Sequence, residues 1–224
     1  MDFRHVTTWI FDLDNTLYAP EMRLFDQIER RMTAYVMREL RVSETQANHL
    51  RRHYWREHGT TLSGLMAEHG IDPMPYLHEV HDIDFSHLVP DPELAALIAD
   101  LPGRKIVHTN GDVVYAARVL RHRGLAVFDQ LHGIDTVGFH PKPDPRAYAA
   151  VIAATGFDPT TAAMFEDDPR NLAVPHALGM RTILVGDGSH GPDALAPGHD
   201  HGPHVQHRTA DLTGFLRGLA ESRG

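Results

Sequence analysis

The chain has 224 residues and a formal net charge of −9, with 42% hydrophobic and 23% charged residues. These values are typical of a globular protein and allow one large domain or a core with a smaller insert. The acidic balance disfavours nucleic-acid binding, which needs a surplus of Lys and Arg at the phosphate backbone. The chain has no cysteine, which excludes disulfides and thiolate catalysis and favours the reducing cytoplasm. We find neither a signal peptide nor a run of about 18 apolar residues, so we expect no membrane segment.

Short apolar runs recur along the chain and predict buried strands. They cover residues 8–13, 105–108, 131–136, 162–166 and 181–185. Helical patterns lie between most of them, at about 112–124, 145–156 and 171–178, and a terminal helix begins near residue 210. Pro175 interrupts the third pattern and is expected to kink that helix. Strands that alternate with helices predict an α/β fold with a doubly wound, mostly parallel sheet covered on both faces.

One long stretch breaks this alternation. Between residues 21 and 88, apolar residues such as Leu24 and Ile28 recur at helical spacing, and no strand-like run is evident. We interpret this stretch as three or four helices inserted after the first strand and call it the helical insert (residues 21–88). Residues 1–20 and 89–224 would then form the core domain, with the insert as a cap.

Polar side chains follow four of the predicted strands. They are Asp12, Asp14 and Thr16 after the first, Thr109 and Asn110 after the second, Lys142 beyond the third, and Glu166, Asp167 and Asp168 after the fourth. Because ligands bind beyond the carboxyl ends of the strands in a parallel sheet, we expect these groups to meet at one edge.

The chemistry of such an edge suits phosphoryl transfer. Clustered carboxylates repel one another unless a cation or proton intervenes, and oxygen ligands suit a hard ion such as Mg²⁺. One carboxylate can attack phosphorus while a second protonates the leaving oxygen and then activates water. Thr16, Thr109, Asn110 and Lys142 supply hydroxyl, amide and ammonium groups that can hold phosphoryl oxygens. Each residue alone is more often a turn, a helix cap or a solvated side chain, so their shared placement carries the hypothesis.

Four segments, DLDNT, TNG, HPKPDP and FEDDPRN, together resemble the motifs of the haloacid dehalogenase-like (HAD) hydrolases. The resemblance covers nearly the whole chain and implies a Rossmann-like core. It implies that Asp12 is the nucleophile and Asp14 the general acid/base. It further implies that Thr109 and Lys142 hold the phosphoryl oxygens, and that Asp12, the Asp14 backbone carbonyl and Asp167 bind Mg²⁺.

Asp14 distinguishes branches of this family. Dehalogenases lack an aspartate two residues after the nucleophile, because they have no leaving oxygen to protonate, whereas phosphatases and phosphomutases keep it. The resemblance therefore implies a phosphatase. The fourth motif departs from many relatives: Asn171 stands where a second acid is common, and Asp168 stands where a serine is common. Asp168 is thus a candidate outer ligand of the metal's waters.

The helical insert carries the text HYWREHGTTLSGLMAEHGID, which together with DLDNTLY and FEDDPRNLAVPHALGM resembles the pyrimidine 5′-nucleotidase branch. That resemblance implies hydrolysis of UMP- or CMP-like nucleoside monophosphates. Thr60 and Thr61 belong to a hydroxyl-rich turn that we expect to lean over the site. Tyr54 and His58 are candidates for stacking on a base or bonding to a ribose, although packing within the insert and a helix C-terminal position explain them equally well.

Other interpretations stay open. The chain could be a phosphatase for a sugar phosphate or phosphoglycolate, a sugar phosphomutase, or a non-catalytic binding protein that kept the scaffold. The His-rich stretch at 186–208 could hold a transition metal, but a solvated loop is the simpler interpretation. The base preference, the oligomeric state and the motion of the insert are not set by the sequence.

Overall fold

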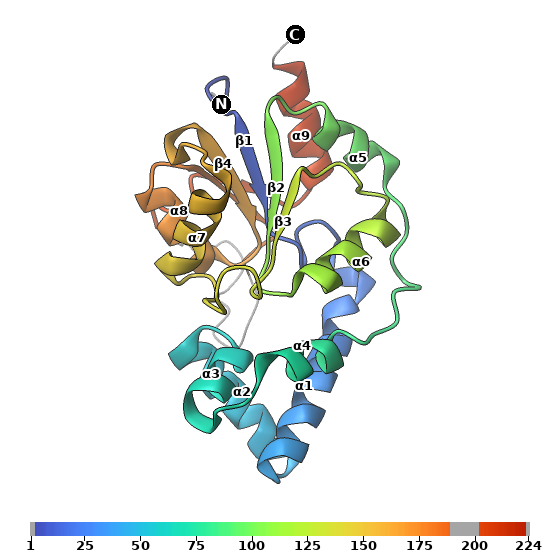
Figure 1. Ribbon diagram of the computed structural model, residues 1–224. Helices are drawn as coiled ribbons and strands as arrows, with labels where there is room; N and C mark the ends of the chain where they lie inside the picture. The colour runs from blue at the N-terminus through green and yellow to red at the C-terminus, as the bar shows by residue number, and fades with distance from the viewer. Residues whose placement is uncertain (1–2, 189–201, 223–224) are drawn as a thin grey trace.

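The computed structural model describes residues 3–188 and 202–222, and its strands form one sheet (Figure 1). The strand order is β3-β2-β1-β4-β5-β6, and every neighbouring pair is parallel. The strands are β1 Thr8–Phe11, β2 Arg104–His108, β3 Gln130–His132, β4 Ala162–Glu166, β5 Arg181–Val185 and β6 His207–Thr209. The predicted α/β fold with a parallel sheet is confirmed.

Side chains of the central strand alternate between two buried cores, as the pleat of a strand requires. Trp9 and Phe11 pack in one core with α5, α6 and α9, whereas Ile10 packs in a second core with α7. The helices of the core region are α5 Pro92–Ala99, α6 Val113–Arg123, α7 Pro145–Thr155, α8 Ala173–Ala177 and α9 Leu212–Glu221. Both faces of the sheet are therefore covered, which explains why the strands read as continuous apolar runs.

The order of the strands decides where a ligand can bind. The chain runs outward from β1 to β2 and β3, then returns to pair β4 with the other side of β1. In such sheets the binding crevice lies beyond the carboxyl ends of the strands where the order reverses, here at β1. Phe11 pairs with Val107 and with Phe165. Asp12 and Glu166 therefore leave the sheet at the same level on neighbouring strands.

The helical insert contains four helices, where the sequence indicated three or four. They are α1 Leu24–Leu40, α2 Glu44–His58, α3 Thr61–His69 and α4 Pro73–Val80. Ser43 begins α2 with a capping box, because its hydroxyl accepts from the Gln46 N–H and the Gln46 side chain accepts from the Ser43 N–H. In Figure 1 the four helices lie together beyond the carboxyl ends of the strands. They face the edge where the candidate site residues emerge.

Two predicted segments have different bounds in the structure. The strand expected at 131–136 ends at His132, because the chain turns at Gly133 against the loop after β2. A Cβ on Gly133 would lie 2.6 Å from the Val113 nitrogen, so the turn is tight. The helix expected at 171–178 is a 3₁₀ turn, Pro169–Leu172, followed by α8. The predicted kink at Pro175 was wrong, because Pro175 lies in the first turn of α8, where a missing N–H costs no helical bond.

Strand β6 lies in a stretch that the sequence presented as a loop. It pairs with β5 at the edge of the sheet, and its side chains are half-buried or exposed. No apolar run therefore marks it. Most of the His-rich stretch, residues 189–201, lies outside the described residues. The interpretation that this stretch holds a metal is therefore not tested by the structure. Among the described helices, none combines the length and the apolar character that a bilayer crossing requires.

Candidate active site

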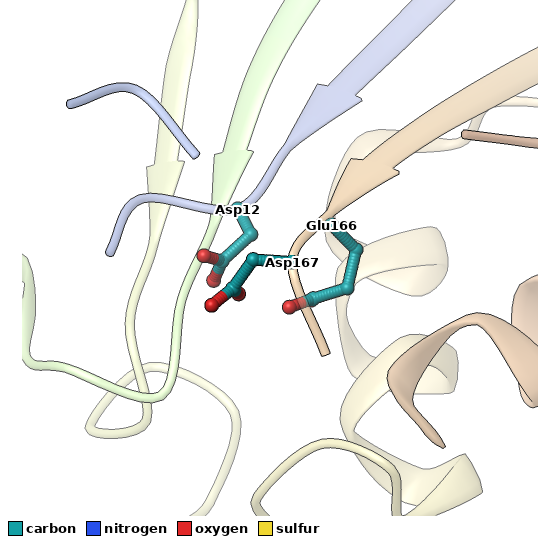
Figure 2. Close-up of side chains that lie close together, drawn as sticks. All are labelled: Asp12, Glu166 and Asp167. Carbon is teal, nitrogen blue, oxygen red and sulfur yellow. The ribbon is translucent and has the colours of Figure 1, made fainter. Parts of the chain in front are cut away.

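Three carboxylates and one lysine form the centre of the site. Asp12 follows β1, Glu166 ends β4 and Asp167 follows it, and Figure 2 shows the three side chains converging beyond the strand ends. Lys142 Nζ donates to Asp12 Oδ1 at 2.6 Å, to Glu166 Oε2 at 2.6 Å and to the His108 carbonyl at 2.9 Å. An ammonium group has three protons, so every donor of this buried lysine is used.

Asn110 fixes the backbone that carries the lysine. Its Oδ1 accepts from the Lys142 N–H at 2.8 Å, and its Nδ2 donates to the Lys142 carbonyl at 3.2 Å. The loop between β3 and α7 is thereby tied to the end of β2, although the two segments are about 30 residues apart. Asn110 also lines the cavity described below. Its amide serves to place Lys142, a role that the sequence did not suggest.

Burial and mutual repulsion perturb the charges of this cluster. Burial raises the pKa of Asp12, and the neighbouring Glu166 and Asp14 raise it further, whereas Lys142 lowers it. The pKa of Asp167 is raised well above its usual value by burial and then by Glu166 and Asp12. Burial would lower the pKa of Lys142, but Asp12 and Glu166 outweigh it and raise that pKa. The lysine therefore stays charged, whereas Asp12 and Asp167 favour their protonated forms unless a further positive charge lies beside them.

The clustered oxygens fit a divalent cation, which would favour the ionised carboxylates. One oxygen each from Asp12, Glu166 and Asp167 lies within 4.8 Å of the other two, and all three residues are buried. The Oδ1 of Asn171 is also buried and has no hydrogen-bond partner among the described residues. Asn171 lines the same cavity as Asp12 and Asp167. Carboxylate and amide oxygens are ligands for hard ions, so Asp12, Asp167 and Asn171 form a candidate metal site, with Glu166 held by Lys142.

Asp14 is held by two tyrosines that the sequence analysis did not single out. Tyr18 Oη donates to Asp14 Oδ1 at 2.6 Å, and Tyr115 Oη donates to the same oxygen at 2.5 Å. Burial raises the pKa of Asp14, while the hydrogen bonds from Tyr115 and Tyr18 lower it. Tyr18 stands four residues after Asp14 in DLDNTLY, a spacing that could have suggested it. Tyr115 is distant in sequence and required the fold.

A second pair supports Tyr115 from the insert side. The His81 ring stacks on Tyr115 with centroids 4.2 Å apart and an interplanar angle of 10°. His81 Nδ1 lies 2.6 Å from Asp112 Oδ2. His81 follows the last helix of the insert, whereas Asp112 caps α6 in the core. The position of the insert is thus linked through His81 and Tyr115 to the carboxylate of Asp14.

The two candidate threonines of the core are buried beside the cavity lining. Thr109 is 1% exposed, and its Oγ1 accepts from the Gly111 N–H at 3.0 Å, so its own proton remains available. Thr16 is 5% exposed, and its Oγ1 has no partner in the described parts of the chain. Neither residue lines the cavity. Their proposed contacts with substrate remain predictions.

A cavity of about 700 Å³ lies between the strand ends and the insert. Its size is ordinary for a small-molecule site. The core contributes Asp12, Asp14, Asn110, Lys142, Asp167, Asp168 and Asn171 to the lining. The insert contributes the predicted Thr60 and Thr61, and also Asn48, Arg51, Arg52 and Trp55, which the sequence analysis did not single out. The carboxylate of Asp168 accepts from Arg170, with the shortest distance 2.7 Å, which leaves it less free for a metal-bound water.

Two residues of the insert lie elsewhere than expected. Tyr54 is fully buried inside the insert, and its Oη lies 2.7 Å from His69 Nε2. His58 lies 2.9 Å from Glu68. Neither Tyr54 nor His58 lines the cavity, because the apolar side of α2 turns inward to the insert. The packing interpretation of Tyr54 therefore fits the structure better than a substrate contact.

The hydroxyl of Thr60 is used locally. Its Oγ1 accepts from the Ser63 N–H at 3.1 Å, as the N-cap of α3. Thr61, the first residue of α3, is 7% exposed. Both line the cavity, but capping already occupies one acceptor position of Thr60.

Comparison with known proteins defines the class. The family model described as haloacid dehalogenase-like hydrolase matches residues 6–179, and the chain therefore belongs to this family. Phosphate metabolism protein 8 of Saccharomyces cerevisiae is 24% identical over 195 residues, covering 79% of this chain and 60% of the yeast protein. The chain thus spans less than two thirds of that relative.

Solved structures with the same fold include proteins of two activities. A predicted phosphoglycolate phosphatase from Haemophilus somnus 129pt matches with a TM-score of 0.63 and 17% identity, covering 96% of this chain and 98% of that one. An L-2-haloacid dehalogenase from Xanthobacter autotrophicus matches with a TM-score of 0.54 and 14% identity, covering 96% and 98%. At such identities the likeness shows the fold alone, so the choice of reaction depends on the residues of the site.

Proposed function

We propose that the chain is a Mg²⁺-dependent phosphomonoesterase that hydrolyses pyrimidine nucleoside 5′-monophosphates, such as UMP and CMP, through a phosphorylated Asp12. The observation that carries the proposal is the second carboxylate, Asp14, which lines the same cavity as Asp12 and is held by two tyrosines. A reaction without a leaving oxygen has no use for this group.

The two carboxylates divide the reaction into two steps. Asp12 attacks phosphorus, the bond from phosphorus to the ester oxygen breaks, and Asp14 gives its proton to the departing alcohol. Asp14 then takes a proton from water, whose oxygen attacks phosphorus and releases phosphate and free Asp12. A bound Mg²⁺ supplies positive charge for the phosphoryl oxygens, and Asp12, Asp167 and Asn171 are the residues that would hold it.

Lys142 has a different part in this scheme. Its three protons are bonded to Asp12, Glu166 and the His108 carbonyl. It therefore orients Asp12 and opposes the rise in the pKa of that carboxyl that burial causes. Thr109 retains a free hydroxyl proton, which suits it to donate to a phosphoryl oxygen.

The test of the reaction class is the variant Asp14→Asn. An amide cannot move the proton, so we expect phosphate release from UMP to fall about 10²- to 10⁴-fold. Asp12→Asn should abolish it. The matched control is Asp144→Asn, which changes the half-buried N-cap of α7 outside the cavity. Wild-type turnover in Asp14→Asn, or halide release from a 2-haloacid by the wild-type protein, would contradict the phosphatase assignment.

The substrate is tested by a panel of phosphate esters with Mg²⁺. Nucleoside 5′-monophosphates, sugar phosphates and phosphoglycolate should be compared at equal concentration, with Asp12→Asn as the blank. We expect the largest kcat/KM for UMP and CMP. A preference for phosphoglycolate or a sugar phosphate would keep the mechanism and replace the substrate.

The absence of cysteine suits a cytoplasmic nucleotide enzyme.

A further inference from the structure

Helix α2 presents two different sides. One side carries Ala47 and Tyr54, which are buried inside the insert. The other side carries Asn48, Arg52 and Trp55, which line the cavity. Their spacing of four and three residues places them in one stripe along the helix. We call Asn48, Arg52 and Trp55 the α2 stripe.

The amide of Asn48 is fixed in one orientation. Its Oδ1 accepts from Thr33 Oγ1 at 2.9 Å and faces an Arg51 guanidinium nitrogen at 3.4 Å. Because a guanidinium only donates, the atom facing it must be the oxygen. Arg51 is itself held by Glu29 at 3.1 Å. The Nδ2 group of Asn48 has no partner among the described residues, so its two protons are available to a ligand in the cavity.

Arg52 differs from the other arginines of the lining. Arg51 pairs with Glu29, and Arg170 pairs with Asp168. Arg52 is exposed and has neither a hydrogen bond nor an ion pair with another described residue. It stands one helical turn after Asn48, so both side chains bring donors to the same part of the cavity.

Trp55 adds a flat wall beside these donors. The Arg170 guanidinium lies 3.3 Å from the centroid of the Trp55 ring, a cation–π contact that joins the insert to the segment after β4. Arg170 is in turn held by the Asp168 carboxylate. The indole is therefore restrained, with one face covered by Arg170, and a planar group would lie against the rest of the ring.

The α2 stripe offers donors and an aromatic wall. A matching ligand is planar and carries carbonyl oxygens, and it must be joined to a phosphate that reaches Asp12 in the same cavity. We propose that Asn48, Arg52 and Trp55 form the leaving-group subsite, in which Asn48 and Arg52 donate to the carbonyl edge of a pyrimidine base. This inference rests on the proposed phosphatase function and assigns the residues that select its substrate.

The stripe also argues against small leaving groups. Glycolate has a carboxylate that Arg52 could bind, but it has no ring to cover Trp55 and fills little of a cavity of about 700 Å³. Adenine is planar but has no carbonyl oxygen, so only its ring nitrogens could accept from the two donors. Uracil and cytosine satisfy both requirements, as does the larger guanine, so GMP belongs in the comparison with UMP and CMP.

The test compares two substrates in each variant. p-Nitrophenyl phosphate shares the phosphoryl group but lacks the pyrimidine edge, so the ratio of kcat/KM for UMP to that for p-nitrophenyl phosphate isolates the subsite. We expect the ratio to fall about ten- to a hundredfold in Arg52→Met and several-fold in Asn48→Ala, since each loses a hydrogen bond to the base. The matched control is Arg56→Met, one turn further on the same helix and outside the cavity lining, where the ratio should not change.

A binding measurement removes the dependence on turnover. In Asp12→Asn protein, UMP binding should quench the tryptophan fluorescence. The change can be assigned to Trp55, because the only other tryptophan, Trp9, is buried in the core. Adding Arg52→Met should weaken UMP binding about ten- to a hundredfold and leave inorganic phosphate binding as it was.

The outcomes separate the two proposals. No Asp12-dependent release from p-nitrophenyl phosphate would remove the phosphatase itself. Two results would overturn the subsite alone while phosphate release persists. In the first, the ratio of kcat/KM for UMP to that for p-nitrophenyl phosphate is unchanged in Arg52→Met. In the second, this ratio falls as much in Arg56→Met as in Arg52→Met. A phosphoglycolate preference that is lost in Arg52→Met would also overturn it, since the stripe would then bind a carboxylate.

Discussion

Lys142 shows how a single side chain sets the state of its neighbours. A buried lysine normally loses charge, since burial disfavours the ionised form. Here two carboxylates at 2.6 Å reverse that effect and raise its pKa. One lysine cannot balance Asp12, Glu166 and Asp167 together. The cluster therefore takes up either protons or a further cation, while the hydrogen bond from Lys142 fixes the position of Asp12.

The two tyrosines on Asp14 lead to a prediction about pH. Their hydrogen bonds stabilise the ionised carboxylate, so they lower a pKa that burial has raised. In Tyr115→Phe the pKa of Asp14 should rise further. Since Asp14 must lose its proton to activate water, we expect the acidic limb of the kcat profile to move about one pH unit upward.

The measurement uses p-nitrophenyl phosphate, because its leaving group needs little protonation. The attack of water on phosphorylated Asp12 should then limit kcat. Tyr35→Phe is the control, because Tyr35 is buried within the insert away from the cavity lining. An acidic limb that stays in place, or moves downward, would show that Tyr115 does not support the ionised form of Asp14.

At the scale of elements, α2 and α3 of the insert pack through Gly64. A Cβ at this position would overlap the Tyr54 ring. Alanine improves helix propensity by about 1 kcal/mol, but overpacking costs about 1–3 kcal/mol. We therefore expect Gly64→Ala to lower the free energy of unfolding by up to about 2 kcal/mol, measured by urea titration.

A matched glycine provides the control. Gly218 lies in α9, and a Cβ there meets nothing within 4 Å. Gly218→Ala should raise the free energy of unfolding by about 0.5–1 kcal/mol. Equal effects of the two substitutions would mean that the contact between Gly64 and Tyr54 does not constrain the insert.

The elements also show what the sequence can and cannot predict. Apolar runs located the four inner strands β1, β2, β4 and β5, because strands buried on both faces need continuous apolar side chains, and another such run overlaps the edge strand β3. The edge strand β6 lacks such a run and was missed. Helical spacing found α2, but spacing does not say which side meets the core of the insert and which side meets a ligand. Tyr54 was therefore taken for a candidate contact, while Asn48 and Arg52 were overlooked.

The candidate site divides in the same way. Residues directly after strands, such as Asp12 and Asp167, could be placed at one edge because parallel strands end together. Tyr115 and His81 reach the site from a helix and from the end of the insert, and only the packing of the whole chain brings them to Asp14. Contacts between residues so far apart in the chain cannot be predicted from the local sequence.

At the scale of the whole molecule, the carboxylate cluster opposes folding. Asp12, Glu166 and Asp167 must be brought within 4.8 Å of one another in a buried place. A cation that binds only the folded protein stabilises it by mass action, by about 2.7 kcal/mol at a hundredfold excess over its Kd. For a chain of this size, Mg²⁺ should then raise Tm by roughly 5–10 °C, compared with NaCl of equal ionic strength.

The variant Asp167→Asn tests the same cation site, because it should change Tm in opposite ways without and with Mg²⁺ relative to the wild type. The raised pKa of Asp167 means that its ionised form is unfavourable in the folded state, since burial and its acidic neighbours both oppose the charge. This cost is present above the unfolded pKa of aspartate, near 4, and therefore at neutral pH. Without Mg²⁺ the variant should melt at a higher temperature than the wild type, yet gain little from added Mg²⁺. A variant that melts lower without Mg²⁺ and still gains the full shift would place the cation elsewhere.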